Sequence, residues 1–344
     1  MLYNGDTGEE IDSGKGGMMT PEELWEDYIK SGGEERQKEA WAFCGGGKEA
    51  DELLSLVKEG KKRGTASSLI AYKTEKQPLP SVEDLSIILD SKNEAHLIIK
   101  TRKVTVTPFL DVHPYHGFLE GEGDRSLSYW RKVHEEFFAP DYKAEGLGFD
   151  PMGDVVLEEF DVVYPNEYSD KDEIYLTLPI KEESEAYREY KNEFISDHSP
   201  MDGTGFLRDY DDICAWVDKE NGMWKEENLP VGFVPSTLFV AKRRGDGRIV
   251  GMISIRHTLN NYLLKIGGNI GYSVRPSERG KGYGKKMVAL ALPYLKTLKI
   301  KKALVTCNDY NKASRSIITS NGGIYDNTIE TEEGLIERYW INIL

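Results

Sequence analysis

The chain has 344 residues, of which 39% are apolar and 30% charged, and its formal net charge is −15. This composition is typical of globular proteins, and the length suffices for two ordinary domains. The sequence contains no run of about 18 apolar residues and no N-terminal signal pattern, so we expect a cytoplasmic protein without a membrane-spanning helix. The acidic balance argues against broad, non-specific binding of nucleic acid, although a local groove could still be basic.

Three cysteines, Cys44, Cys214 and Cys307, lie far apart in the chain. Their odd number and wide spacing predict neither a disulfide framework nor a zinc site. We therefore expect no metal, and we expect Cys307 to be buried at the end of a strand rather than to act as a nucleophile.

Residues 1–19 are polar and rich in glycine, and are predicted to be disordered. A helix is predicted to begin at Thr20-Pro21, because a capping threonine, a proline at the first position and acids in the first turn favour a helix start. A second helix is expected over Glu49–Glu59, with Gly60 ending it.

Apolar runs predict the strands of the first half, and Ser126 is expected to cap a helix that continues through Phe138. This half has more strands than helices and no regular alternation of the two, which favours a small β-barrel with helices at its ends. The predicted strands are Leu85–Leu89, His96–Val106 and Val155–Val163.

Residues 20–165 resemble the ASCH domain, a PUA-like β-barrel family proposed to bind RNA. The resemblance is carried by an ordered set of short motifs rather than by any single one. They are Trp41-Ala-Phe43, Gly-Lys-Lys-Arg-x-Thr at 60–65, Gly-Glu-Gly-Asp-Arg-Ser-Leu-x-Tyr-Trp at 121–130, and a closing run, Val-x-x-Glu-x-Phe-x-Val-Val-Tyr, at 155–164.

Some small ASCH proteins are amidohydrolases that remove acetyl groups from acetylcytidine, with a Lys-x-x-Thr pair and a facing glutamate. The resemblance implies Lys62, Thr65 and Glu122 as the matching positions. A threonine hydroxyl needs a nearby base, and a lysine whose pKa is lowered by burial could serve. The alternative is that Lys61–Arg63 form a basic patch, solvated or facing phosphate, beside a barrel cleft.

A polar linker, residues 166–171, separates this half from a second domain at 172–344. The second domain is predicted to begin with an alternating strand and two amphipathic helices, followed by two strands that a tight turn joins at 244–247. The strands are Glu173–Ile180, Leu238–Lys242 and Ile249–Arg256, and the helices are Lys181–Ser196 and Phe206–Asn221.

A strand at Gly267–Val274 is followed by a glycine-rich loop and then by a helix that begins near Tyr283. A glycine-rich turn that opens a helix leaves several N–H groups for a phosphate. Residues 251–300 hold nine Lys/Arg and one Asp/Glu, a net of +8 in an acidic chain. The spacing matches neither a P-loop nor a dinucleotide fingerprint. Pro293 is expected to bend the helix.

The pattern Arg279-x-x-Gly282-x-Gly284, with its preceding strand and the following segment at 304–311, resembles the acetyl-CoA loop of the GNAT superfamily of N-acetyltransferases. The resemblance covers residues 172–344 and implies a mixed sheet with two splayed strands. Acetyl-CoA would lie between these strands as the cosubstrate. The implied cofactor-binding residues are Tyr272, Ser273, Val274, Arg279, Gly280, Lys281, Gly282, Tyr283, Gly284, Lys285, Asn311 and Ser314.

Direct transfer of an acetyl group to an amine needs a base, and an N–H that stabilises the carbonyl oxygen. Relatives use a tyrosine seven residues after the asparagine as the acid, but this position is Ile318 here. The acid is left open among Tyr283, Tyr310 and Tyr325. His257 is a candidate base, with a structural role as its alternative, and Glu278 is expected to be exposed.

Three functions remain open from the sequence. The first is an N-acetyltransferase with an ASCH module that recognises RNA or a nucleoside. The second is an RNA- or nucleoside-binding protein whose GNAT half binds CoA but transfers poorly, and the third is a chain whose first domain also hydrolyses an acetylated nucleoside. The acceptor, a small-molecule or peptide amine, and the oligomeric state are not identified. Acidic and aromatic side chains at 216–233 would suit a cationic amine, or would form a packed lid.

Overall fold

The computed structural model describes residues 19–36, 38–332 and 334–343. The predicted disorder of residues 1–19 therefore falls outside the described residues, except for Met19. Internal contacts divide the chain into two compact units, which we describe separately. Unit 1 contains the described residues up to Thr107 together with Asp154–Asp170, and unit 2 contains Pro108–Gly153 and Lys171 onward.

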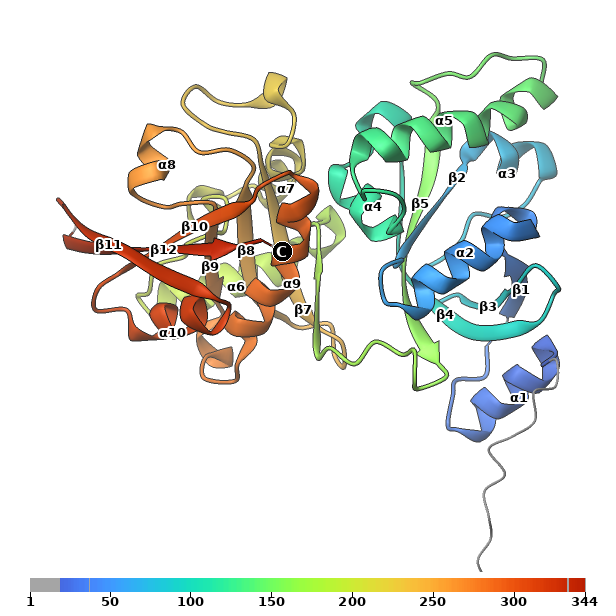
Figure 1. Ribbon diagram of the computed structural model, residues 1–344, viewed down its shortest axis with the longest axis horizontal. Helices are drawn as coiled ribbons and strands as arrows, with labels where there is room; N and C mark the ends of the chain where they lie inside the picture. The colour runs from blue at the N-terminus through green and yellow to red at the C-terminus, as the bar shows by residue number, and fades with distance from the viewer. Residues whose placement is uncertain (1–18, 37, 333, 344) are drawn as a thin grey trace, which may run out of the picture. The chain divides into compact units, whose positions relative to one another are not determined.

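Unit 1 is built on a five-stranded sheet in the order β1-β3-β4-β5-β2 (Figure 1). Strand β1 runs parallel to β3, whereas the β3–β4 and β2–β5 pairs are antiparallel. The curled, barrel-like sheet confirms the predicted β-rich fold. The strands are β1 (Lys38–Ala42), β2 (Gly64–Ser68), β3 (Leu85–Leu89), β4 (Ala95–Pro108) and β5 (Asp154–Tyr164).

Helices α1 (Pro21–Lys30), α2 (Gly47–Lys58) and α3 (Leu69–Glu75) accompany this sheet. The predicted start of α1 is confirmed: the Thr20 hydroxyl accepts from the Glu23 N–H (3.2 Å), and the Glu23 carboxylate accepts from the Thr20 N–H (2.9 Å). Helices α1 and α2 belong to separate apolar clusters, each of which they form with residues of β3 and β4.

Two helices lie between β4 and β5 in the chain, α4 (Pro114–Glu120) and α5 (Leu127–Ala144), and they belong to unit 2. Ser126 caps α5 as predicted, since its hydroxyl accepts from the Tyr129 N–H (3.1 Å). The Tyr115 ring of α4 lies 4.7 Å from Phe239, and its hydroxyl donates to the Leu176 carbonyl (2.9 Å). Helix α4 is therefore part of the core of unit 2.

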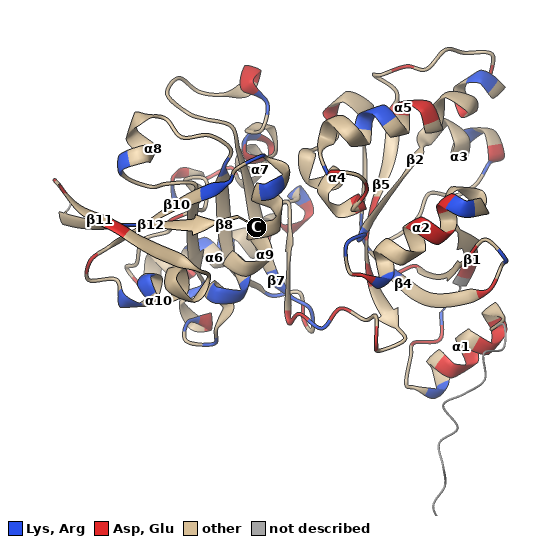
Figure 2. Cartoon of the chain, in the orientation of Figure 1, with Lys and Arg blue, Asp and Glu red and all other residues tan. Residues whose placement is uncertain are grey.

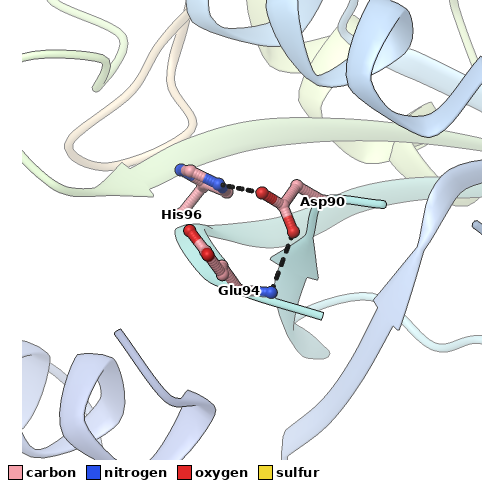
Figure 3. Close-up of side chains that lie close together, drawn as sticks. All are labelled: Asp90, Glu94 and His96. Carbon is pink, nitrogen blue, oxygen red and sulfur yellow. Dashed lines mark hydrogen bonds and ion pairs between the residues drawn. The ribbon is translucent and has the colours of Figure 1, made fainter. Parts of the chain in front are cut away.

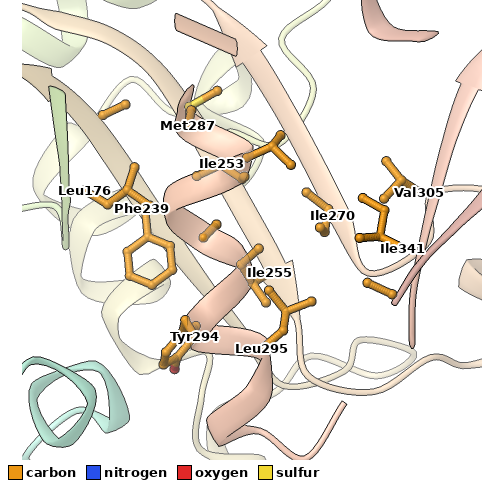
Figure 4. Close-up of a cluster of buried hydrophobic side chains, with 14 of the residues drawn as sticks. Leu176, Phe239, Ile253, Ile255, Ile270, Met287, Tyr294, Leu295, Val305 and Ile341 are labelled. Atoms are coloured by element: carbon orange, nitrogen blue, oxygen red, sulfur yellow. The ribbon is translucent and has the colours of Figure 1, made fainter. Parts of the chain in front are cut away.

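Unit 2 contains a four-stranded antiparallel sheet, β6-β7-β8-β9, and a three-stranded sheet, β10-β12-β11. Helix α9 (Tyr283–Thr297) connects β9 to β10 and contains Pro293 as predicted. Its side chains Met287, Tyr294 and Leu295 pack against residues from both sheets (Figure 4). The strands are β6 (Ile174–Thr177), β7 (Ser236–Arg243), β8 (Ile249–Arg256), β9 (Ile270–Val274), β10 (Lys302–Asn308), β11 (Gly323–Thr331) and β12 (Gly334–Asn342).

Helices α6 (Ser184–Ser196) and α7 (Ile213–Gly222) form a second apolar cluster with residues of β7 and β8. Two shorter helices, α8 (Asn261–Lys265) and α10 (Lys312–Ser320), follow β8 and β10. The sheet in two parts, with helices around it, confirms the fold class predicted for this half, although each strand pair within the two parts is antiparallel. None of the described helices is long and apolar enough to cross a membrane.

The predicted helix over Phe206–Asn221 is wrong in its first part. Phe206 has a left-handed backbone (φ +62°), and Tyr210 is extended. The helix begins only at Ile213, where the Asp212 side chain accepts from the Ala215 N–H (3.1 Å). A sequence pattern with an apolar residue every three or four positions is typical of a helix, but a loop whose side chains pack inward can show the same pattern.

Candidate functional site

Strands β9 and β10 lie together only where they begin. The Asn269 N–H donates to the Leu304 carbonyl (2.7 Å), and the Leu304 N–H donates to the Asn269 side chain (2.9 Å). Beyond this contact no ladder joins the two strands within the residues that the structure describes. The edge of β9 that faces away from β8 is therefore not covered by a paired strand.

The backbone of β9 presents alternate residues to this edge. The Arg275 N–H donates to the Val250 carbonyl of β8 (2.9 Å), which fixes the phase of the antiparallel ladder. Because bonding alternates along an antiparallel strand, the N–H and C=O groups of Tyr272 and Val274 point away from β8. An extended ligand can pair with such an edge as an added strand would.

The loop before α9 carries a group of outward-facing amides. Gly280 (φ +78°) and Gly282 (φ +85°) have left-handed backbones, and a Cβ at either position would meet no atom within 4 Å. Across the described chain, the amides of residues 280–285 make no hydrogen bond to another protein group. Together with the positive end of the α9 dipole, these amides are suited to bind an anion.

Gly284 differs from Gly280 and Gly282, because it lies where the surrounding side chains leave little space for a Cβ. A Cβ at this position would lie 2.6 Å from Ile317 Cδ1 and 3.2 Å from Val274 Cγ2. A side chain here would crowd Ile317 of α10 and Val274 of β9, whose side chains would have to shift. The last glycine of the predicted loop therefore allows close packing of the elements around the amides.

The Arg279 side chain ties the loop to the end of α6. Its guanidinium pairs with Asp197 (2.8 Å) and donates to the Ser199 hydroxyl (2.7 Å) and to the Val274 carbonyl (3.3 Å). The Arg279 side chain therefore holds the loop in place, and its backbone N–H donates to the Pro276 carbonyl (3.3 Å), so the predicted contact of Arg279 with the cofactor stays a prediction.

The prediction that Glu278 is exposed is wrong, since only 4% of this residue is accessible. Its carboxylate pairs with Arg243 (3.1 Å), Arg248 (2.9 Å) and Lys281 (2.8 Å). Burial alone would raise the pKa of Glu278, but these three cations outweigh it and lower the pKa. Two of the partners come from the β7–β8 hairpin, which the local sequence does not reveal.

The remaining predicted cofactor residues surround the open edge. The Tyr272 hydroxyl and the Ser314 hydroxyl are 2.9 Å apart, so they connect β9 to α10. The Asn311 side chain caps α10 by accepting from the Ser314 N–H (3.0 Å). Ser273 is buried, and its hydroxyl lies 3.1 Å from the Tyr190 hydroxyl of α6. Lys285 is exposed in the first turn of α9.

The candidates for the acid occupy different surroundings. Ile318 is buried, and the Tyr283 hydroxyl donates to the Glu173 carboxylate (2.7 Å). Tyr310 and Tyr325 are exposed. Cys307 is buried as expected, and burial raises the pKa of its thiol to about 11.

His257 belongs to a hydrogen-bonded network on the face that α9 covers. Its Nε2 lies 2.9 Å from the Thr237 hydroxyl, which is itself 3.0 Å from the Tyr294 hydroxyl of α9. Burial lowers the pKa of His257 to about 4. The imidazole is therefore neutral near pH 7, as a proton acceptor must be.

The positive charge of residues 251–300 is spread over β8, α8, the loop and α9 (Figure 2). Part of it is neutralised within the protein, because Lys281 pairs with Glu278 and Lys286 pairs with Glu173 (2.6 Å). The loop is therefore moderately basic, and its amides are the groups directed at an anion.

In unit 1, Lys62 lies just before β2, and Thr65 lies within this strand. Lys62 is 1% accessible, and its ammonium lies 5.3 Å from the centroid of the Phe43 ring. The Lys61–Arg63 run does not form one basic patch, since Lys61 pairs with Glu59 (2.6 Å) and Arg63 with Asp170 (3.0 Å). Glu122 belongs to unit 2.

Glu158 is the carboxylate that the sheet of unit 1 places opposite Thr65, and sequence reasoning missed it. Residues that pair directly in an antiparallel ladder project to the same face. The Thr101 hydroxyl donates to Glu158 (3.0 Å), and burial raises the pKa of Glu158.

A second missed group lies on α4 and α5 in unit 2. Glu120 is 2% accessible, and its Oε1 accepts from the Trp130 indole N–H (2.9 Å). The Nε2 atoms of His116 and His134 lie 3.2 and 3.4 Å from the same oxygen. The spacing of His116 and Glu120, four residues apart on one helix, was the available signal.

Asp90, Glu94 and His96 form a group whose ligand atoms lie within 4.8 Å of one another (Figure 3). Their contacts fit a tight turn between β3 and β4. Asp90 accepts from the Glu94 N–H (2.9 Å) and lies 3.1 Å from His96 Nε2. The Lys58 ammonium lies 3.1 Å from Nδ1 of His96. This positive charge would repel a metal ion bound to the group.

Family models match two parts of the chain. A model of the ASCH domain matches residues 39–164, and a model of the acetyltransferase (GNAT) domain matches residues 174–324. A comparison with curated proteins found no match.

Solved structures are similar to each part. An ASCH domain from Lactobacillus crispatus JV V101 is 28% identical over 41% of this chain and 92% of its own, with a TM-score of 0.39. A protein from Enterococcus faecalis V583 is 33% identical over 41% of this chain and 86% of its own, with a TM-score of 0.38. The microcin C7 self-immunity acetyltransferase, in complex with acetyl-CoA and AMP, is 19% identical over 50% of this chain and 94% of its own, with a TM-score of 0.39.

Proposed function

Because this chain joins an ASCH domain to an acetyltransferase domain of the GNAT family, we propose that it transfers the acetyl group of acetyl-CoA directly to an amine, and that the ASCH domain recognises RNA or a nucleoside. Membership of the GNAT family makes the chain an acyltransferase with acetyl-CoA as its cosubstrate. The acceptor and the role of the ASCH domain are the proposed parts.

The observation that carries the proposal is the open edge of β9 beside the unbonded amides of residues 280–285. The pyrophosphate would accept hydrogen bonds from these amides, and the pantetheine arm would pair with the backbone of Tyr272 and Val274. Ser314, at the start of α10, would lie beside the arm. Each group of the ligand is thereby matched by a protein group of complementary chemistry.

In the proposed reaction a neutral amine attacks the thioester carbonyl, and a backbone N–H of β9 stabilises the developing negative charge. His257 stays the candidate base from the sequence, but a pKa of about 4 makes its imidazole a weak proton acceptor at pH 7, which favours its structural alternative. Ile318 carries no proton to give, so the CoA thiolate takes its proton from another group or from water.

A calorimetric titration of acetyl-CoA into the full chain tests the cofactor site. Gly282→Glu places a carboxylate at the amides, and we expect it to weaken acetyl-CoA binding at least about 100-fold by charge repulsion. Gly146→Glu is the matched control, because Gly146 also has a left-handed backbone (φ +74°) with no atom within 4 Å of a Cβ. Equal affinity of the two variants would contradict the assignment of the loop.

A second candidate activity, hydrolysis of an acetylated nucleoside, is supported by the burial of Lys62 near Thr65. A neutral lysine amine can act as a base toward a threonine hydroxyl, and Lys62 lies three residues before Thr65 in the chain. We expect Lys62→Ala and Thr65→Ala each to abolish the release of acetate from acetylcytidine while leaving acetyl-CoA binding unchanged. Hydrolysis that persists in both variants would exclude this activity.

A further inference from the structure

Three titratable side chains of unit 1 form one hydrogen-bonded chain beside the turn between β3 and β4. His96 Nε2 lies 3.1 Å from an Asp90 carboxylate oxygen (Figure 3), and His96 Nδ1 lies 3.1 Å from the Lys58 ammonium. Lys58 is the last residue of α2, whereas His96 is the second residue of β4. Elements far apart in the chain thereby bring an amine, an imidazole and a carboxylate into contact in that order. This order is the signature of an activated nucleophile, its base and the group that orients the base.

The carboxylate determines which nitrogen of His96 carries a proton. An ionised carboxylate only accepts hydrogen bonds, so His96 Nε2 donates to Asp90. Burial would raise the pKa of Asp90, but hydrogen bonds from His96 and from two amides of the turn lower it, so the carboxylate is ionised near pH 7. His96 Nδ1 is therefore the nitrogen with the lone pair, and it accepts a hydrogen bond from the Lys58 ammonium.

The Lys58 ammonium lies where its charged form is less well solvated than in water. The residue is half-buried, and its Nζ lies 5.5 Å from the centroid of the Tyr168 ring. Within the described residues Lys58 makes no ion pair. Burial lowers the pKa of Lys58, although the charges of Asp90 and Glu167 oppose this effect. Transfer of one proton to His96 leaves a neutral amine whose lone pair can form a new bond.

The three side chains line one open hollow of about 250 Å³ in unit 1. The other charged side chain of its lining is Asp51, whose carboxylate accepts from the N–H and the hydroxyl of Ser91 (2.8 and 2.7 Å). Two carboxylates at the hollow favour a ligand that is neutral or becomes positively charged, and they disfavour an anion. The lining residues are Asp51, Leu54, Ser55, Lys58, Asp90 and His96.

The amides around the hollow narrow the class of reaction. The N–H groups of Ser91, Lys92 and Glu94 each donate to a side-chain carboxylate. An acyl transfer to Lys58 passes through an oxyanion, which amides engaged in this way do not stabilise. Formation of an imine leaves a positive charge on the nitrogen instead, and the neighbouring carboxylates stabilise that charge.

We propose that Lys58 is a nucleophilic lysine that forms an imine with a small uncharged aldehyde, with His96 as its general base and acid. The ammonium gives one proton to His96 Nδ1, and the neutral amine bonds to the carbonyl carbon. His96 returns the proton to the carbonyl oxygen, which yields a carbinolamine. A second proton passes from the nitrogen through His96 to the hydroxyl, which leaves as water while the nitrogen lone pair forms the C=N bond. Asp90 holds His96 in the tautomer that these transfers need.

The test treats the full chain at pH 7 with propanal and cyanoborohydride, which reduces an imine to a stable secondary amine. Mass spectrometry of peptides then measures the rate of modification at each lysine. Lys48 is the matched control, because it lies on the same helix and is exposed and paired with Glu52 (3.0 Å). We expect Lys58 to react at least about tenfold faster than Lys48.

His96→Gln keeps a polar side chain but removes the base. We expect the rate at Lys58 to fall about tenfold and the rate at Lys48 to stay the same, with thermal unfolding as the check that the variant is folded. Glyoxylate is an anionic aldehyde, and we expect the ratio of the Lys58 rate to the Lys48 rate to be smaller with glyoxylate than with propanal.

Equal rates at Lys58 and Lys48 in the native chain would overturn the proposal, whether or not the variant folds. An unchanged rate at Lys58 in folded His96→Gln would overturn the role of His96. A rate ratio that is equal or greater with glyoxylate would overturn the assignment of an uncharged ligand.

Discussion

Replacement of Glu278 by glutamine tests how the cofactor loop is held. The carboxylate is 5% accessible and has three cationic partners at 2.8 to 3.1 Å. Removal of one member of a buried ion pair costs about 3–5 kcal/mol, because the remaining charges lose their partner. Here Lys281 and Arg248 keep access to water, which screens part of the loss. We therefore expect a loss of about 2–3 kcal/mol in the free energy of unfolding.

The assay is thermal unfolding of the full chain at pH 7. For a unit of this size a change of 1 kcal/mol shifts Tm by about 2–4 °C, so we expect a decrease of roughly 5–10 °C in the transition of unit 2. Glu189→Gln is the matched control, because Glu189 is exposed on α6. We expect the control to change the free energy of unfolding by less than about 0.5 kcal/mol.

The pH dependence gives an independent check. Folding lowers the pKa of Glu278, so its ionised form stabilises the folded state above the unfolded pKa near 4.5. This contribution is lost as the pH falls through the lower, folded pKa. The difference in stability between the native chain and Glu278→Gln should therefore shrink below pH 4.5. A Tm within 1 °C of the native value at pH 7, or a difference that grows in acid, would refute the reasoning.

Three further changes test other parts of the structure by thermal or chemical unfolding. Asn311→Ala removes the cap of α10 and should cost about 1 kcal/mol, and no loss would show that the cap is not formed. Trp130→Phe deprives the buried Glu120 of an N–H donor and should cost about 1–3 kcal/mol, whereas a neutral effect would mean that the indole bond contributes little. Burial raises the pKa of Glu158, so its protonated form favours folding and this contribution is lost as the pH rises. Glu158→Gln should therefore be more stable than the native chain at pH 7, with the difference vanishing below about pH 4.5, and lower stability of the variant at pH 7 would contradict this.

Features that depend on a few neighbouring residues were readable from the sequence. The helix starts at Thr20 and Ser126 follow from side chains that bond to amides three residues away. The loop before α9 follows in the same way, because Gly280 and Gly282 supply left-handed backbones within one turn. Capping bonds and left-handed glycines depend only on neighbouring residues, wherever the segment lies in the fold. The local pattern is therefore sufficient to predict them.

Features that depend on distant segments were not readable. Glu278 looked exposed because its partners Arg243 and Arg248 come from a hairpin some 30 residues earlier. The helix predicted from Phe206 fails because Phe206 has a left-handed backbone and Tyr210 is extended, so only a single 3-10 turn, Leu207–Asp209, forms before Ile213. Glu158 lies opposite Thr65 only through the register of β2 and β5.

The sequence by itself therefore indicated the resemblance to two families, the glycine-rich loop before α9 and most of the elements, because each depends on residues that are neighbours in the chain. Only the tertiary structure placed Gly203, in the loop between α6 and α7, against the Gly271–Tyr272 peptide. It alone placed α4 in the core of unit 2. Both contacts join segments far apart in the chain, and their energy depends on shape and register, which no local pattern encodes.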